Sequence, residues 1–195
     1  MPVNTKPAPS QPAYTSFQST DMSQQPLILT LTLSPQTTSL LTHLRTKHFP
    51  AERNHLSAHI TLFHAIPAAS LATLSQTLSS TCSVTAPFTL GIKNPFMLGR
   101  KGVALHIASC KLRVLHERIL GELERDGVQL TEQDGRVGRA HVTVQNKVSE
   151  EEAKRTLVAL KQEWEERAGR AEGMSLWRYE VGGTWTHLQE FTFTG

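Results

Sequence analysis

One short pattern occurs twice in this chain and constrains its fold more than any other feature. The segment AHITL at 58–62 and the segment AHVTV at 140–144 both run alanine, histidine, β-branched apolar residue, threonine, apolar residue. Because side chains alternate across a strand, each copy predicts a strand with His59 or His141 and the following threonine on one face. The apolar residues then point to the other face, toward a core. A chain that repeats this pattern is expected to fold as two related units.

Hydrophobic periodicity predicts a similar order of elements around each copy. Ser34-Pro35 and Ser109 are expected to begin helices, and Ser149 with Glu152 forms a capping box. In chain order we expect a strand at 27–33, a helix at 35–47, a strand at 58–63, a helix at 68–80, strands at 87–94 and 102–109, a helix at 110–125, a strand at 140–145, a helix at 150–164, and strands at 175–181 and 187–194.

Both motif strands stand just before a helix, at comparable points of the two halves. The pattern therefore predicts an α+β fold that is bilobal, with a pseudo-two-fold duplicated unit. We expect an antiparallel or mixed sheet in each lobe, helices packed outside, and an active cleft between the lobes. The inward stripes of the first two helices are expected to be Leu40, Leu41 and Leu44, and Leu71, Leu74 and Leu78.

Composition limits the domain organisation and the partners. Residues 1–26 consist mostly of Pro, Gln, Ser and Thr and are expected to form a disordered tail, which leaves 27–195 as one domain. A net charge of +3 without a basic stripe suits an anionic ligand and argues against duplex DNA. Without a membrane span, a signal peptide or a cysteine framework, the chain is expected to be a monomer of the cytoplasm or the nucleus, away from membranes.

The two histidine–threonine pairs suit chemistry at phosphorus. A neutral imidazole takes a proton from a nucleophile while a protonated one gives a proton to the leaving oxygen, so His59 and His141 are the candidate catalytic pair. The hydroxyls of Thr61 and Thr143 donate hydrogen bonds to non-bridging phosphoryl oxygens. This chemistry requires neither a metal nor a cofactor.

These motifs resemble those of the two-histidine (2H) phosphoesterase superfamily, in its 2′-5′ RNA ligase-like and cyclic phosphodiesterase branch. HITL at 59–62 and HVTV at 141–144 carry the resemblance. The first strand, the hairpin around LGRKG and the closing segment that begins SLWRYEV support it over residues 27–194. The resemblance implies metal-independent chemistry on phosphodiesters next to a ribose hydroxyl. It also implies that His141 activates water and that His59 protonates the departing ribose oxygen.

Four further residues are candidate substrate contacts: Arg100 and Lys101 in a basic turn, Arg139 before the second motif, and Trp185 in a closing strand. For each of them a solvated or packing role is the alternative. His55 and His59 have the spacing of a helical zinc pair, but the segment leads into a strand and lacks the glutamate of a metalloprotease motif, so no metal site is expected. The other histidines are interpreted as surface or packing residues, with His64 a minor candidate.

The leading hypothesis is a metal-independent phosphodiesterase that opens 2′,3′-cyclic phosphates of nucleotides or RNA ends. Its alternatives within the superfamily are a 2′-5′ RNA ligase and an RNA 3′-end exonuclease. A non-catalytic nucleotide- or RNA-binding module is the alternative from a different class.

Overall fold

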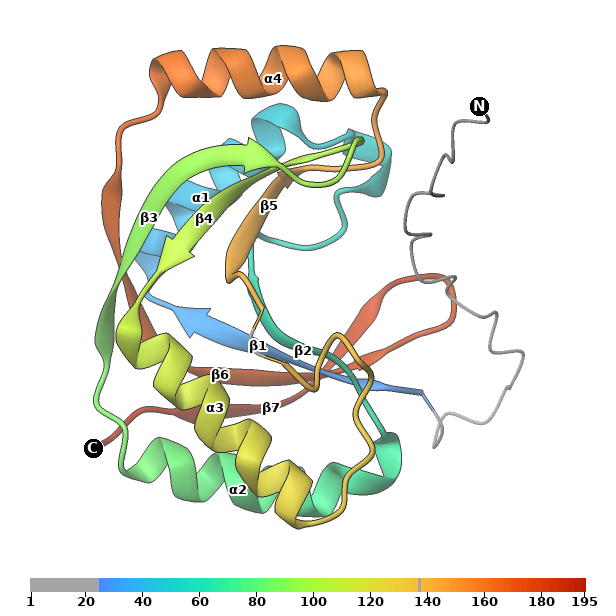
Figure 1. Ribbon diagram of the computed structural model, residues 1–195, viewed down its shortest axis with the longest axis vertical. Coiled ribbons are helices and arrows are strands. Elements are labelled where there is room, and N and C mark those ends of the chain that lie inside the picture. Colours follow the sequence, from blue (N-terminus) through green and yellow to red (C-terminus); the bar gives the residue numbers. More distant parts are fainter. Residues whose placement is uncertain (1–24, 137) are drawn as a thin grey trace, which may run out of the picture.

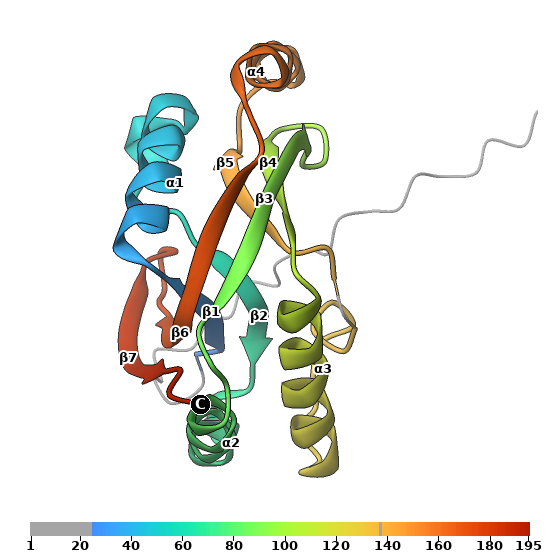
Figure 2. The ribbon, with the colours of Figure 1, turned by 90° about the vertical axis from the view of Figure 1, so that its left-hand side faces the viewer.

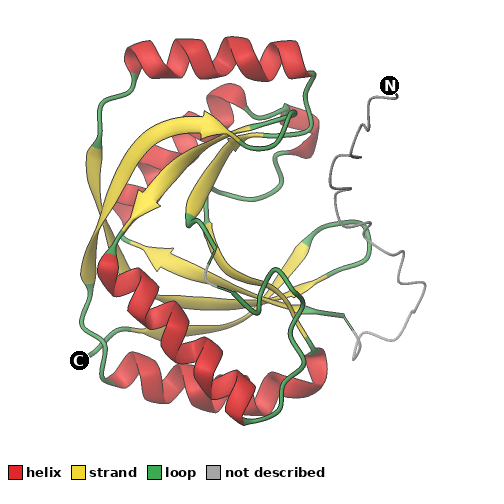
Figure 3. Cartoon of the chain, viewed as in Figure 1, coloured by secondary structure: helices red, strands yellow, loops and turns green. Residues whose placement is uncertain are grey.

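The computed structural model describes residues 25–136 and 138–195. In this part of the chain the strands form one seven-stranded sheet in the order β2-β1-β6-β3-β4-β5, with β7 paired to β6 beside this path. Every paired neighbour is antiparallel, and Figures 1 and 3 show the sheet curled between the helices. The elements are β1 (Leu27–Leu33), α1 (Pro35–His48), β2 (Ile60–Ile66), α2 (Leu71–Ser83), β3 (Phe88–Met97), β4 (Val103–Ala108), α3 (Cys110–Arg125), β5 (His141–Gln145), α4 (Glu150–Glu163), β6 (Arg167–Tyr179) and β7 (Trp185–Thr192), with short 3-10 turns at Ala51–Arg53 and Ala68–Ser70.

The long strand β6 joins the two halves of the sheet. Residues 167–171 at its start pair with β3, and residues 171–178 pair with β1. One lobe therefore contains β1, β2 and β7, and the other contains β3, β4 and β5 (Figure 1). The predicted bilobal α+β fold is confirmed, and the two lobes share one continuous sheet.

Two helices cross from one lobe to the other. Helix α1 follows β1 in the chain but packs beside β5, and α3 follows β4 but packs against α2. Both crossings are visible in Figures 1 and 2, where α1 lies with the upper strands and α3 with the lower ones. Helix α4 covers β3 and β4, while α2 lies against β6 and β7. The helices that precede the motif strands β2 and β5 therefore tie the two lobes together.

The core lies between the sheet and the helices. Alternation in β1 buries its four leucines on one face, and the register sets Leu29 opposite Phe63 and Leu31 opposite Ile60. Burying each such side chain contributes roughly 1.5–3 kcal/mol. From the helices, the core receives the following fully or almost fully buried residues: Leu41, Leu74, Leu78, Leu112, Leu115, Ile119, Leu123, Ala153 and Leu160.

The predicted helix starts are confirmed by their caps. The side chains of Ser34, Ser109 and Ser149 each accept a hydrogen bond from the backbone N–H three residues later, at 3.4, 3.3 and 3.2 Å. Each cap satisfies one of the N–H groups that a helix leaves without an internal partner.

Some of the expected strand boundaries and some of the expected inward-facing helix residues were wrong. Strand β2 begins at Ile60, so His59 precedes the strand instead of lying inside it. Strand β3 continues through Pro95 to Met97, because a bulge between Ile92 and Pro95 accommodates a residue that lacks an N–H.

The inner faces of the first two helices also differ from the prediction. In α1 the buried residues are Thr37, Leu41 and Arg45, while Leu40 and Leu44 are half-buried. In α2 the first leucine, Leu71, is 41% exposed because the α-helix starts there, after a 3-10 turn.

The predicted tail at 1–26 lies outside the described residues except for its last two. Gln25 is buried, and the carbonyl of Pro26 accepts a hydrogen bond from the N–H of Tyr179 at 2.9 Å. These two residues therefore belong to the folded domain. Among the residues that the structure describes, no helix combines the length and the apolar character needed to cross a bilayer.

Candidate active site

The two motif strands occupy opposite ends of the sheet path and nevertheless lie close together. Strand β2 is paired only with β1, and β5 only with β4, within the described residues. The curl of the sheet brings Cα atoms of these two end strands within 8 Å of one another. Sheets twist and coil in this way because each strand has a right-handed twist. The first histidine–threonine pair therefore lies near the second.

His59 and His141 have the same local geometry. The Nδ1 atom of His59 lies 2.8 Å from the carbonyl oxygen of Ser57, and that of His141 lies 2.9 Å from the carbonyl oxygen of Arg139. Because a carbonyl only accepts, Nδ1 carries the hydrogen in both neutral rings and Nε2 has a free lone pair. Neither Nε2 has a hydrogen-bond partner within the described residues. Both rings are half-buried, and in both Nε2 is the nitrogen available to a ligand.

Both motifs line a common cavity of about 420 Å³. Thr61, Leu62 and His64 contribute from β2 and His141 from β5, while the rest of the wall comes from β4, the first turns of α3 and the loop before β5. His59 and Thr143 are not among the lining residues. Both threonines are half-buried, and neither hydroxyl has a partner in the described part of the chain. These hydroxyls are therefore available to a ligand.

The environment of His59 keeps its ring neutral. Burial lowers its pKa from the ordinary value to about 4. The hydrogen bond to the Ser57 carbonyl opposes this, whereas the charges of Arg45, His141 and His64 lower the pKa further. At neutral pH the imidazole of His59 is therefore uncharged.

A buried arginine connects the two motif strands. Arg45 of α1 is 6% exposed, and its Nη1 donates to the carbonyl oxygen of Thr143 at 2.9 Å. Its Nε donates to Oδ1 of Asn54, in the loop that leads to His59, at 2.8 Å. The guanidinium also stacks 3.8 Å from the ring centre of Phe49. Burial lowers the pKa of Arg45 to about 10, which leaves it charged at neutral pH.

A buried carboxylate closes the free edge of β2. The oxygens of Asp134 accept hydrogen bonds from the N–H groups of His64 and Ala65, both at 2.8 Å. Its Oδ1 also lies 3.1 Å from Nδ1 of His64. Asp134 thereby attaches the loop before β5 to the edge strand that carries the first motif, and it occupies N–H groups that would otherwise be open to pairing.

His116 of α3 forms a hydrogen bond with a backbone carbonyl of β2. Its Nε2 lies 3.1 Å from the carbonyl oxygen of Leu62, and its ring stacks on Phe63 with centroids 4.5 Å apart. His116 is therefore a packing residue, as the sequence suggested. Burial lowers its pKa, so the ring is neutral and Nε2 donates.

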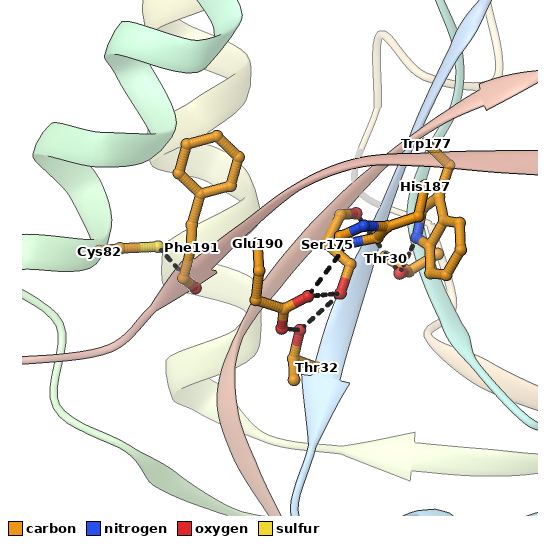
Figure 4. Close-up of polar contacts among 8 residues, drawn as sticks. All are labelled: Thr30, Thr32, Cys82, Ser175, Trp177, His187, Glu190 and Phe191. Atoms are coloured by element: carbon orange, nitrogen blue, oxygen red, sulfur yellow. Dashed lines mark hydrogen bonds and ion pairs between the residues drawn. The ribbon is translucent and has the colours of Figure 1, made fainter.

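Trp185 lies against the first catalytic candidate. Its ring centre is 4.8 Å from that of His59 and 6.2 Å from that of Trp177. Trp177 is in turn held by a hydrogen bond from its Nε1 to the hydroxyl of Thr30 at 2.8 Å (Figure 4). Thr30 is the cross-strand partner of Thr61, so these side chains share the face of the sheet that carries the motif.

A polar cluster holds β7 on this face. The carboxylate of Glu190 accepts hydrogen bonds from the hydroxyls of Thr32 and Ser175, and His187 approaches the same carboxylate (Figure 4). The ring of His187 also meets that of Trp177 edge-on, with centroids 4.9 Å apart. The cluster fixes the strand that begins at Trp185.

Of the remaining predicted contacts, Arg139 lies at the cavity. It lines the wall, and its guanidinium sits 4.3 Å from the ring centre of Phe96, which meets His141 edge-on. Arg100 instead pairs with Glu150 of α4, with Nε to Oε2 at 2.7 Å, and neither Arg100 nor Lys101 is among the residues that line the cavity.

A model of the 2′-5′ RNA ligase superfamily matches residues 33–183, more than half of the chain. The chain belongs to this superfamily. Its motifs and its fold are those of the two-histidine phosphoesterases, as the resemblance at 59–62 and 141–144 predicted.

Solved structures with low sequence identity share the fold. E. coli LigT complexed with 3′-AMP superposes with a TM-score of 0.62 at 18% identity, covering 88% of this chain and 99% of that chain. TT0787 of Thermus thermophilus gives a TM-score of 0.60 at 16% identity, covering 87% and 98%. E. coli LigT complexed with NADP+ gives 0.57 at 18% identity, covering 88% and 99%. Comparison with the curated proteins finds no match.

Sequence reasoning missed two buried charged residues that contact the motif strands or the loop before the first motif. Arg45 is a buried residue of α1 that the expected inner stripe of Leu40, Leu41 and Leu44 left out, and its position one turn after Leu41 is the signal that could have indicated a buried role. Asp134 lies in a polar loop among other polar residues, and nothing in its neighbourhood distinguishes it.

Proposed function

We propose that this protein is a metal-independent phosphodiesterase that opens 2′,3′-cyclic phosphates of nucleotides or RNA ends by acid–base catalysis with His59 and His141. One observation carries the proposal: both imidazoles donate from Nδ1 to the carbonyl two residues earlier, which leaves both Nε2 atoms free, and the two motifs line one cavity through Thr61 and His141. An in-line displacement at phosphorus needs an acid and a base on opposite sides, and two such rings supply them.

In the hydrolytic direction, Nε2 of His141 takes a proton from water as its oxygen bonds to phosphorus. The bond from phosphorus to one ribose oxygen breaks, and Nε2 of His59 gives that oxygen a proton. The hydroxyls of Thr61 and Thr143 donate to the non-bridging oxygens, where negative charge increases in the transition state. The assignment of acid and base follows the family resemblance.

The low pKa of His59 sets a condition on this assignment. A ring that is neutral in the empty site becomes an acid only after it has gained a proton on Nε2. A phosphate anion bound within hydrogen-bond reach favours the protonated ring and raises its pKa. In this scheme, binding of the substrate causes His59 to take up the proton that it later donates.

A nucleotide as substrate is supported by the superfamily and by the solved complexes. E. coli LigT structures are complexes with 3′-AMP and with NADP+. The half-buried aromatic rings of Trp185 and Phe96 lie next to His59 and His141 and are available to stack on a base.

The direct test is hydrolysis of 2′,3′-cyclic AMP by purified protein in the presence of EDTA, followed by chromatography of the products. We expect opening of the ring, and we expect His59→Ala and His141→Ala each to reduce kcat at least about a hundredfold. His43→Ala is the matched control, because His43 is exposed on α1. Full activity in either motif variant, or no turnover despite ligand-induced thermal stabilisation, would contradict the proposal.

The superfamily match favours one second candidate, 2′-5′ RNA ligation, because the same acid–base pair works in reverse. Incubation with two RNA ends, one cyclic phosphate and one 5′-hydroxyl, distinguishes it. A joined product with a 2′-5′ linkage indicates ligation, and an opened end alone indicates hydrolysis.

A further inference from the structure

The cavity between the motif strands has a marked charge imbalance. Its wall includes the first turns of α3 and the loop before β5, in addition to Thr61 and His141. Within the described chain, seven of its lining residues carry an imidazole or a guanidinium and none carries a carboxylate: His64, His106, His116, His141, Arg113, Arg136 and Arg139. The three guanidiniums carry the charge, because burial lowers the pKa of His106 and of His116, and they raise the local concentration of anions.

The arginines of this wall are not neutralised by strong ion pairs. The guanidinium of Arg113 has no ion pair or hydrogen bond within residues 25–136 and 138–195, and that of Arg139 stacks on Phe96 without a carboxylate partner there. Arg136 approaches Glu132 at 3.5 Å, but both side chains are largely exposed, and such a pair is weak. Asp134, another acid near this wall, is buried, and its carboxylate is engaged by the backbone of β2.

Two further features of α3 point to a ligand in the same place. The N-terminal end of this 16-residue helix faces the cavity through Ser109, Cys110 and Arg113, and a helix N-terminus favours anions. Deeper in the wall, His116 is 7% exposed, and its Nδ1 has no partner among the described residues. Since Nε2 donates to Leu62, Nδ1 is an acceptor, which a hydroxyl of the ligand would satisfy.

We propose that this cavity is a second anion subsite, and that the substrate carries a phosphate group besides the one that reacts. The inference rests on the proposed function: one phosphate lies at the two motifs, and a second reaches Arg113 and Arg136. A cavity of about 420 Å³ is within the range of small-molecule sites. A 5′-phosphate and an internucleotide phosphate offer the same charge and oxygens to the arginines.

The experiment compares three substrates with one reacting group: 2′,3′-cyclic AMP, the same nucleotide with a 5′-phosphate, and a dinucleotide that ends in a 2′,3′-cyclic phosphate. At low salt we expect the second phosphate to raise kcat/KM about tenfold over 2′,3′-cyclic AMP, and we expect salt to reduce this ratio. A rise with only one of the two phosphorylated substrates identifies the source of the phosphate.

The double variant Arg113→Gln/Arg136→Gln should bring this ratio close to one. Arg118→Gln, on the exposed side of the same helix and outside the cavity, should retain the wild-type ratio. A ratio near one in the wild type, or a tenfold ratio that survives the double variant, overturns the subsite while leaving the proposed function intact.

Binding provides a readout that does not depend on turnover. Calorimetry with adenosine 3′,5′-bisphosphate and adenosine 3′-monophosphate should show tighter binding of the bisphosphate by about tenfold, lost in the double variant. If none of the three substrates reacts, the proposed function fails and this comparison decides the subsite on its own. Equal affinities would overturn it.

Discussion

The guanidinium of Arg45 donates a hydrogen bond from Nη1 to the carbonyl oxygen of Thr143, across a sequence separation of 98 residues. Through its Nε the same side chain holds Asn54, in the loop that leads to His59. One buried cation from α1 thus contacts the backbone of the second motif and the approach to the first. Its charge also lowers the pKa of His59. Arg45 is a positioning residue with an electrostatic effect on the candidate acid.

Replacement of Arg45 should separate these two effects. Arg45→Met leaves the carbonyl of Thr143 and the amide of Asn54 without a donor, and we expect a loss of about 2 kcal/mol in the free energy of unfolding. We also expect the pKa of His59 to rise, because a positive charge has been removed. Arg45→Lys keeps the charge but not the planar fork, so kcat should fall with little change in that pKa.

NMR titration of the histidine rings and chemical denaturation measure these outcomes. Arg155→Met, on the exposed face of α4, is the matched control. An unchanged His59 pKa in Arg45→Met would show that the electrostatic effect is absent.

Thr61→Val and Thr143→Val test the role of the hydroxyls. Valine preserves the shape of the side chain, and we expect kcat to fall about a hundredfold in each variant, because a donor to a charge that grows in the transition state is lost. Thr89→Val, at an exposed position of β3, should retain full activity. A rise in KM without a fall in kcat would instead assign the hydroxyls to ground-state binding alone.

The pKa of His59 should depend on the ligand. In the free protein it lies near 4, so the ring should remain neutral from pH 5 upward. Adenosine 2′-monophosphate places an anion at the motifs and should raise this pKa toward neutrality, which NMR titration with and without the nucleotide would detect. If the pKa of His59 stays near 4 in the complex, the proposed assignment is wrong, and His59 would be the base and His141 the acid.

Asp134→Asn should destabilise the edge of β2. Burial by itself would raise the pKa of Asp134, but hydrogen bonds from His64 and Ala65 outweigh it and lower the value below its usual range. The ionised carboxylate therefore stabilises the folded state above the unfolded pKa of about 4, and this contribution disappears as the pH falls through the folded value.

We expect Asp134→Asn to lower the free energy of unfolding by about 2 kcal/mol at pH 7, with a smaller difference from the wild type below pH 4. Denaturation at several pH values measures it, with Asp126→Asn at the exposed end of α3 as the control. An identical difference at all pH values would show that the charge of Asp134 contributes nothing.

The features that could be predicted from the sequence are those set by local periodicity. Alternation in residues 27–33 and in the motif segments identified their strands. Ser34, Ser109 and Ser149 marked helix starts, because each of them caps its helix through a hydrogen bond to a residue only three positions later. The features that could not be predicted depend on partners far along the chain. Asp134 contacts residues about 70 positions away, and no local pattern records such a contact. The charged cavity wall is likewise assembled from three separate stretches of the chain, within 61–64, 106–116 and 133–141.

The crossing of α1 and α3 makes each half of the chain dependent on the other for its own packing. A fragment that ended after α2 would present α1 without β5, and a fragment that began at β3 would present α3 without α2. Each fragment would expose to solvent the apolar face of a helix, α1 or α3, whose packing partner is missing. Two copies of one such half could cover these faces by exchanging the helix, as domain-swapped dimers do, whereas in this chain both partners belong to one polypeptide.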